Sequence, residues 1–228
     1  MTLNEQPDAA LNGAARTLDT DWTVRWMRSS AQVLAANRAE LNTLDRAIGD
    51  GDHGENMDRG FQAIVPKLEA LPDDTTPGAV LKLVATTLIS TVGGAAGPLY
   101  GTAFLKAAGA VGSADSLDAA ALVALMTAAR DGIVLRGKAE NGNKTMVDAW
   151  SPAVDAAEAA HAAGSSVDAV LTAAADAAAQ GAHDTEPWVA RKGRASYLGE
   201  RAIGHRDPGA QSTALLLRAA SDLTPEAE

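Results

Sequence analysis

The chain of 228 residues is 46% hydrophobic and only 4% aromatic, and it carries a formal net charge of −10. An acidic chain argues against non-specific nucleic-acid binding, which needs a basic face, and the lack of cysteine excludes disulfides, thiolate metal sites and cysteine nucleophiles. No apolar run approaches the roughly 20 residues of a membrane span, and the N-terminus lacks the features of a signal peptide. We therefore expect a cytoplasmic protein.

Helical periodicity accounts for most of the chain. Residues 1–18 are polar and expected to be poorly ordered, whereas residues 19–228 are expected to form one domain. Apolar residues at helical spacing predict helices over residues 19–48, 55–71, 77–92, 98–111, 122–137, 145–163, 167–182 and 207–223. No stretch alternates in the way that predicts a strand. The expected fold is all-α, a bundle of about eight helices joined by short loops.

The first candidate site lies at the end of the first predicted helix, in LDRAIGDGDHGENMDRGF, Leu44 to Phe61. It contains three closely spaced carboxylates: Asp45, Asp50 and Asp52. Gly49 and Gly51 let the backbone fold back so that these groups converge, and hard oxygen ligands suit Mg²⁺ or Ca²⁺. An EF-hand is excluded because Phe61 stands where its last glutamate is required. The alternative is a solvated turn between two helices.

Two glycine-containing helix starts follow. His53, Gly54 and Asn56 open the next helix, where free N–H groups favour phosphate, although a lone histidine is more often a cap or faces solvent. The second start is STVGGAAGPLYGTAF, Ser90 to Phe104, whose backbone amides could cradle a phosphate or whose small residues could admit an adenine ring. On the glycines alone, close packing of helices is the favoured explanation of the second stretch.

Two later segments complete the candidate site. The first of them is Arg136 to Trp150, RGKAENGNKTMVDAW, which is close to the P-loop motif. A P-loop is rejected because Asn143 adds one residue between Gly142 and Lys144 and because no predicted strand precedes the segment. ARKGRASYLGERAIGHRDPGA, Ala190 to Ala210, is a basic island on an acidic chain, and arginine offers a fork for phosphate. Taken together, the carboxylates, the glycine-rich helix starts and the arginines predict a nucleotide–Mg²⁺ site without a P-loop.

Four of these stretches occur in an order that resembles the nucleotide-binding L subunit of dihydroxyacetone kinase, a module also found as the C-terminal half of single-chain, ATP-dependent kinases. They are LDRAIGDGDHGENMDRGF, GGAAGPLYGTAF, NKTMVDAWSPA and RKGRASYLGERAIGHRDPGA. The resemblance runs from about Trp22 to Leu223. It implies a barrel of eight antiparallel amphipathic helices with the nucleotide among the loops at one end.

The resemblance also implies roles for individual residues. Ligands of two Mg²⁺ ions would be Asp45, Asp50 and Asp52. Nucleotide contacts would be His53, Gly54, Asn56, Ala95, Ala96, Gly137, Met146, Arg194, Asp207, Pro208 and Gly209, with Arg194 on the phosphates; no further catalytic residue is assigned. The family's Gly-Gly-Ala-Ser-Gly has Ala96 in place of serine here, which removes a hydroxyl, and its Gly-Asp-Lys-Thr has Asn143 in place of aspartate, which removes a carboxylate.

The implied function is that of a phosphoenolpyruvate-dependent glycerone kinase, active with partner subunits. A K subunit would hold dihydroxyacetone on a histidine, and a phosphohistidine protein of the sugar phosphotransferase system, the M subunit, would rephosphorylate tightly bound ADP. Alternatives are an ATP-exchanging subunit for dihydroxyacetone or another short ketose such as erythrulose, a non-catalytic nucleotide-binding regulatory module, and an unrelated helical metal-binding protein. The oligomeric state is left open, a homodimer included.

Overall fold

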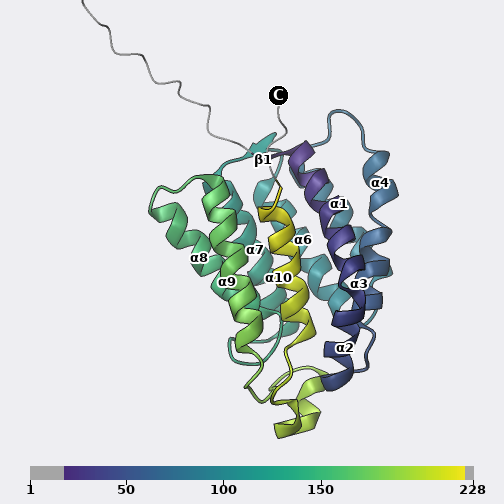
Figure 1. Ribbon diagram of the computed structural model, residues 1–228. Helices are drawn as coiled ribbons and strands as arrows, with labels where there is room; N and C mark the ends of the chain where they lie inside the picture. The colour runs from purple at the N-terminus through teal and green to yellow at the C-terminus, as the bar shows by residue number, and fades with distance from the viewer. Residues whose placement is uncertain (1–17, 224–228) are drawn as a thin grey trace, which may run out of the picture.

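The computed structural model describes residues 18–223, and helices make up most of them (Figure 1). In chain order they are α1 (Thr20–Ala36), α2 (Arg38–Ile48), α3 (His53–Gln62), α4 (Val65–Glu69), α5 (Pro77–Thr91), α6 (Ala96–Val111), α7 (Ala119–Gly137), α8 (Val147–Ala162), α9 (Val167–Asp184), the 3₁₀ helix η1 (Arg194–Ala202) and α10 (Pro208–Ser221). The expected all-α fold is confirmed.

The helices form a closed ring around a common core (Figure 1). Passing around the ring, α1, α3, α5, α6, α7, α8, α9 and α10 pack against one another in turn, and α10 packs back against α1. The short helices α2 and α4 prolong α1 and α3 toward opposite ends of the ring. The pair α1 and α2 corresponds to one predicted helix, and the pair α3 and α4 corresponds to another. When each pair is counted once, the expected number of about eight helices agrees with the structure.

Two predicted helices are broken, and each break has a local cause. The helix predicted over residues 19–48 is interrupted at Asn37, whose backbone leaves helical values (φ −97°, ψ 8°) and whose side chain donates to the Val33 carbonyl at 2.8 Å. The helix predicted over residues 55–71 is interrupted before α4, in whose first turn Pro66 lacks the N–H that would continue the hydrogen-bond ladder. Prediction of a single continuous helix was wrong in both places.

A two-residue strand pair lies at one end of the barrel. Leu18 and Asp19 form β1 (Leu18–Asp19), which pairs antiparallel with β2 (Ser116–Leu117), and Leu18 is fully buried opposite Leu117. Two residues are too few to show an alternating pattern, so this strand pair could not be predicted from the sequence. Of the N-terminal segment expected to be poorly ordered, residues 1–17 lie outside the described residues.

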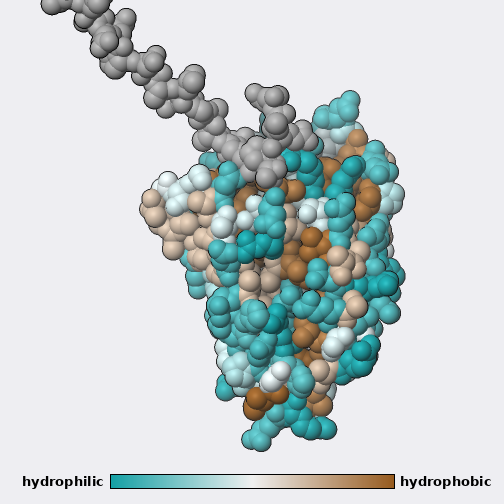
Figure 2. Space-filling view, viewed as in Figure 1, coloured by the Kyte–Doolittle hydropathy of each residue, from teal (hydrophilic) through white to brown (hydrophobic). Residues whose placement is uncertain are grey.

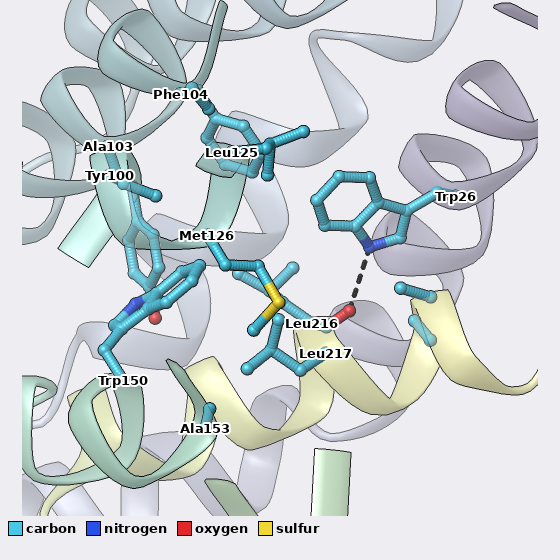
Figure 3. Close-up of a cluster of buried hydrophobic side chains, with 14 of the residues drawn as sticks. Trp26, Tyr100, Ala103, Phe104, Leu125, Met126, Trp150, Ala153, Leu216 and Leu217 are labelled. Carbon is cyan, nitrogen blue, oxygen red and sulfur yellow. Dashed lines mark hydrogen bonds between the residues drawn. The ribbon is translucent and has the colours of Figure 1, made fainter. Parts of the chain in front are cut away.

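Side chains from five helices meet inside the barrel (Figure 3). Trp26 of α1 packs on Phe104 of α6 with ring centroids 5.9 Å apart, and its indole N–H donates to the Leu216 carbonyl of α10 at 2.9 Å. Alanine and glycine allow the helices to approach closely: a Cβ on Gly181 of α9 would lie 2.2 Å from the Asp148 carbonyl of α8. This packed core fixes the positions of the loops at the ends of the barrel.

The end of the barrel opposite β1 gathers the stretches that the sequence singled out. The end of α2 and η1 lie together there, at the lower end of Figure 1. The face in view is mainly hydrophilic, with hydrophobic residues scattered across it (Figure 2). Among the described residues no helix combines the length and apolar character needed to cross a bilayer.

Candidate functional site

Asp45 organises the turn between α2 and α3. One of its carboxylate oxygens, Oδ2, accepts the backbone N–H groups of Gly51, Asp52 and His53 at 2.9, 2.9 and 3.1 Å. Gly51 has φ +83°, which favours glycine. A Cβ on Gly49 would lie only 2.1 Å from the other oxygen of Asp45. The chain therefore folds tightly around a carboxylate that is 8% exposed, and both glycines are needed for this turn.

The turn brings the three predicted carboxylates together. Asp45, Asp50 and Asp52 each offer one oxygen, and these oxygens lie within 4.8 Å of one another. Oxygens bound to a single Mg²⁺ at about 2.1 Å lie at most about 4.2 Å apart. A small rotation of the exposed Asp50 and Asp52 side chains, or the use of two ions, closes the difference. The donor set therefore fits a hard divalent cation.

The basic segment that contains Arg194 reaches this cluster. The guanidinium of Arg194 lies 3.0 Å from the Asp50 carboxylate, and its side chain is 69% exposed. Arg194 is the first residue of η1, which packs against α2 through a small apolar cluster: Ile48, Ala190, Ala195 and Ala202. A cation that can form two hydrogen bonds with a phosphate thus lies beside the three carboxylates.

A cavity of about 200 Å³ joins these groups. All the predicted site residues line it except Gly54 and Gly137. A second, mainly apolar cavity of about 270 Å³ shares Ala95, Leu99 and Met146 with the first, and Gly137 lies in its wall with Ile133. The two cavities together suit a ligand whose charged part lies in the first cavity, near the carboxylates, and whose flat apolar part lies in the second.

Gly54, which was expected to contact the nucleotide, lies in α3 at the place where that helix packs against the start of α2. A Cβ at this position would lie 2.1 Å from the Arg38 carbonyl, so glycine is needed for α3 to pack against the start of α2. Gly54 is not among the residues that line either cavity. A contact between its backbone and a ligand remains a prediction without a test here.

The glycine-rich stretch forms the entrance to α6. Gly94 has φ +64°, and a Cβ on Gly93 would lie 2.8 Å from the Asn56 side-chain oxygen. Helix α6 begins after Ala95 without a side-chain cap, and Ala96 occupies its first turn beside the cavity. An uncapped first turn leaves backbone N–H groups for an anion. The interpretation as helix packing is also correct in part, because a Cβ on Gly97 would lie 2.3 Å from the Val92 carbonyl.

The start of α10 differs because it supplies its own cap. Asp207 Oδ2 accepts the Ala210 N–H at 2.7 Å, and Pro208 stands in the first turn. Burial raises the pKa of Asp207 to about 7, an effect that the Ala210 hydrogen bond opposes and the nearby Asp148 reinforces. The carboxyl group thus keeps its proton near neutral pH more readily than an ordinary aspartate.

A buried hydrogen-bond network connects His53 to the barrel interior. His53 Nε2 lies 2.9 Å from Ser212 Oγ, and the hydroxyl of Tyr100 lies 2.8 Å from the same oxygen and 2.9 Å from Thr213 Oγ1. Burial lowers the pKa of His53 to about 4, against the opposing effect of Asp45 and Asp52. Sequence reasoning missed Tyr100 and Ser212, whose apolar and helical surroundings give no local signal.

The near-P-loop segment contributes two buried charged side chains that the sequence assigned no role. Asp148 is 4% exposed and accepts the N–H groups of Gly142 at 2.6 Å and Thr145 at 2.7 Å. Lys144 belongs to the cavity wall but is only 1% exposed, because its ammonium donates to a group of backbone carbonyls, among them those of Thr185 and Ala202. The rejection of a P-loop agrees with this geometry, because the lysine is held by protein groups.

Comparison with known proteins adds to this geometry. A family model described as the DAK2 domain matches residues 47–222. The chain belongs to the DAK2 domain family. The resemblance drawn from the sequence is therefore confirmed.

Relatives of similar length carry a consistent name. The chain is 45% identical over 195 residues to the PEP-dependent dihydroxyacetone kinase, ADP-binding subunit DhaL, of Escherichia coli (strain K12), with 86% of this chain and 92% of the relative covered. It is 42% identical over 199 residues to the PTS-dependent dihydroxyacetone kinase, ADP-binding subunit DhaL, of Lactococcus lactis subsp. lactis (strain IL1403), with 87% and 95% covered.

Solved structures share the fold. The dihydroxyacetone kinase of C. freundii in complex with AMP-PNP and Mg²⁺ superposes with a TM-score of 0.67 at 25% identity. The superposition covers 97% of this chain, but this DAK2 chain spans only 37% of that kinase. The native form of the same kinase gives a TM-score of 0.68 at 23% identity, which establishes the fold.

Proposed function

We propose that this DAK2 protein is the ADP-binding subunit of a phosphoenolpyruvate-dependent dihydroxyacetone kinase. In this proposal a phosphoryl group from a phosphohistidine protein reaches dihydroxyacetone by way of the bound nucleotide. The observation that carries it is the convergence of Asp45, Asp50 and Asp52 beside a cavity that suits a ligand with a charged part and an apolar part. The chain also matches ADP-binding subunits over nearly its whole length.

Different residues of the site would bind the base and the phosphates of the nucleotide. The cavity wall of Leu99, Ile133 and Met146 offers an apolar surface to the base. The uncapped start of α6 offers N–H groups to phosphate oxygens, and Arg194 offers its guanidinium. Phosphoryl transfer needs alignment and charge neutralisation more than covalent chemistry, so these residues supply what the reaction requires.

Mg²⁺ is part of the proposal, with two ions held by the three carboxylates. When bound it would neutralise charge on the phosphate oxygens. Asp45 would keep its orientation because three backbone N–H groups hold its other oxygen. Asp50 and Asp52 are exposed and can turn toward a ligand.

The acceptor site lies outside this chain in our proposal. Among described residues we find no second constellation of comparable chemistry, and the chain spans only 37% of the single-chain kinase with which it superposes. A separate K subunit would hold dihydroxyacetone, and a phosphohistidine M subunit would supply the phosphoryl group in the cytoplasm. A homodimer remains compatible with this scheme.

An ATP-exchanging subunit for dihydroxyacetone or another short ketose is the second candidate, and one relative is named for such a ketose. The L-erythrulose 1-kinase of Mycolicibacterium smegmatis is 38% identical over 189 residues, although this chain covers only 33% of its length. The two candidates differ in whether the nucleotide leaves the site between turnovers. They share the same carboxylates and cavity.

One experiment separates these candidates. The purified chain is denatured, the released nucleotide is identified and counted, and the intact protein is then tested for exchange with labelled ATP. About one ADP per chain that does not exchange supports the ADP-binding subunit, whereas rapid exchange supports the second candidate. A chain that carries no nucleotide and takes up none with Mg²⁺ would refute both.

A further inference from the structure

Lys144 has an unusual environment. Its backbone is left-handed (φ +63°), its side chain is 1% exposed, and it lines the cavity together with Thr145 and Met146. The ammonium donates to four backbone carbonyl oxygens. They belong to Thr185 at 2.8 Å, Glu186 at 3.2 Å, Trp188 at 3.0 Å and Ala202 at 2.8 Å.

These carbonyls come from the two ends of one loop. We call residues 185–204, which form most of the connection from α9 to α10 and include η1, the arginine loop. Thr185, Glu186 and Trp188 lie at its beginning, and Ala202 lies near its end. An ammonium has only three N–H groups, so four acceptors must share them, as in the coordination of a cation by carbonyl oxygens. Lys144 therefore closes the loop at its base.

Other contacts also attach the arginine loop to its surroundings: its helix η1 packs on α2, and Glu186 near its start pairs with Arg206. Its apolar contacts form a cluster separate from the main core, and Tyr197 in it is 87% exposed. Two backbone hydrogen bonds contribute: Gly204 N–H donates to the Glu186 carbonyl at 2.8 Å, which joins the two ends of the loop, and Arg191 N–H donates to the Asn143 carbonyl at 3.0 Å, which attaches the loop to the connection between α7 and α8. The second of these joins the loop to the residue beside Lys144.

Arg194 depends on this backbone for its position. Its side chain is 69% exposed, so packing holds it weakly, and among the described residues the ion pair with Asp50 is its one polar side-chain contact. In the proposed site this guanidinium lies near the phosphates. An arginine that moves freely in the unbound protein must be ordered on binding, and the loss of conformational entropy weakens the affinity. A fixed loop base reduces that cost.

We propose that Lys144 is a positioning residue that closes the arginine loop and thereby holds Arg194 at the phosphate end of the nucleotide site. This inference rests on the proposed nucleotide binding and assigns Lys144 no contact with the ligand. Asp148 supports it, because its bonds to the N–H groups of Gly142 and Thr145 hold the turn in which Lys144 adopts its left-handed backbone. Burial lowers the pKa of Lys144, while Asp207 and Glu186 oppose this effect.

The test compares Lys144→Met with Lys138→Met. Lys138 is a matched control because it also has a left-handed backbone (φ +54°) in the same connection, but its side chain is exposed. Nucleotide-free proteins are titrated with ADP in Mg²⁺ and with adenosine. We expect Lys144→Met to weaken ADP binding about tenfold or more, as for the loss of charge-assisted hydrogen bonds, and to leave adenosine binding unchanged. Lys138→Met should change neither.

A double-mutant cycle with Arg194→Met tests the route of the effect. If Lys144 acts through Arg194, Lys144→Met should have almost no further effect on ADP affinity once Arg194→Met is present. Full additivity of the two losses would overturn the inference, as would an equal loss of ADP and adenosine binding. If Lys144→Met does not fold, Lys144→Gln retains two donors and should show a smaller loss with the same dependence on Arg194.

Amide hydrogen exchange gives a readout that does not need the nucleotide. Residues 190–202 should exchange faster in Lys144→Met than in Lys138→Met, and the helices of the barrel should not. Unchanged exchange in this loop would refute the inference even if ADP binds. A wild-type chain that binds no ADP would instead refute the proposed function, while the exchange result would still decide the role of Lys144 in closing the loop.

Discussion

The Arg194 guanidinium and the Asp50 carboxylate lie 3.0 Å apart, and both residues line the cavity at the end of the barrel. The pair spans two loops that are far apart in the sequence, one after α2 and the other before α10. Its side chains are 69% and 40% exposed, so solvent screens the attraction and the pair adds little to stability. We therefore expect the arrangement to act through the charge that it presents to a ligand.

Replacement of this arginine should separate binding from stability. We expect Arg194→Met to weaken binding of ADP in Mg²⁺ about tenfold or more, because a charge-assisted bond to phosphate is lost. The melting temperature should change little. Calorimetric titration and a thermal melt measure the two effects. Arg201→Met, in the same loop but outside the cavity lining, should bind ADP normally; equal losses in both variants would point to general electrostatic attraction.

Removal of charge from Asp45 should abolish divalent-ion binding. Asparagine keeps an oxygen that can accept the three N–H groups of the turn, so we expect Asp45→Asn to fold, but it lacks the charge that a hard cation needs. ADP retained by the wild-type protein should be lost in Asp45→Asn, and also from the wild-type protein after chelation with EDTA. Asp73→Asn, at an exposed site between α4 and α5, is the control. Normal metal occupancy in Asp45→Asn would contradict the assignment.

Gly49 and Gly109 should respond oppositely to alanine. A Cβ on Gly49 would lie 2.1 Å from an oxygen of Asp45, whereas no atom lies within 4 Å of a Cβ on Gly109 in α6. We expect Gly49→Ala to displace the Asp45 carboxylate and to weaken Mg²⁺ binding. Gly109→Ala should stabilise the fold by about 0.5–1 kcal/mol through the unfolded state and leave Mg²⁺ binding intact. Chemical denaturation and metal titration of both variants measure this contrast.

The sequence predicted the parts of the site that are close together along the chain. Asp45, Asp50 and Asp52 were identifiable because glycines lie between them and a turn is the simplest way to accommodate such a stretch. Arg194 was identifiable within a basic island, although its pairing with Asp50 was not. The helix break at Asn37 escaped prediction because asparagine is tolerated inside many helices, and only the realised bond to Val33 shows where the backbone turns.

Contacts between distant residues explain what the sequence did not reveal. Ser212 contacts His53 although most of the chain separates them in sequence. The Thr185 carbonyl that accepts from the Lys144 ammonium is likewise separated from Lys144 by more than one helix in the sequence. A backbone carbonyl has no side-chain signature, so no residue pattern could indicate that this lysine binds protein oxygens instead of phosphate. Gly54 shows the converse, since a glycine beside a predicted ligand site is needed for helix packing.

Asp207 should make the stability of the nucleotide-free protein fall as pH rises. Its pKa in the folded protein is about 7, raised chiefly by burial from an ordinary value of 3.8. Between these values the folded state binds more protons than the unfolded state, so the free energy of unfolding decreases with pH, by a few kcal/mol at most, and then levels off above about pH 7. His53 has the opposite effect, because its lowered pKa of about 4 makes the folded state bind fewer protons up to its ordinary value of 6.5.

Asp207→Asn isolates the first of these two effects. Asparagine can still accept the Ala210 N–H as a helix cap, but it does not titrate, so only the contribution of Asp207 is removed. Urea denaturation of the chelator-treated proteins at several pH values between 4 and 8 gives the difference in unfolding free energy. We expect the stability of Asp207→Asn relative to wild type to increase as pH rises to about 7. A constant difference across this range would mean that Asp207 is ionised in the folded protein throughout, and that its burial is compensated by charges around the cavity.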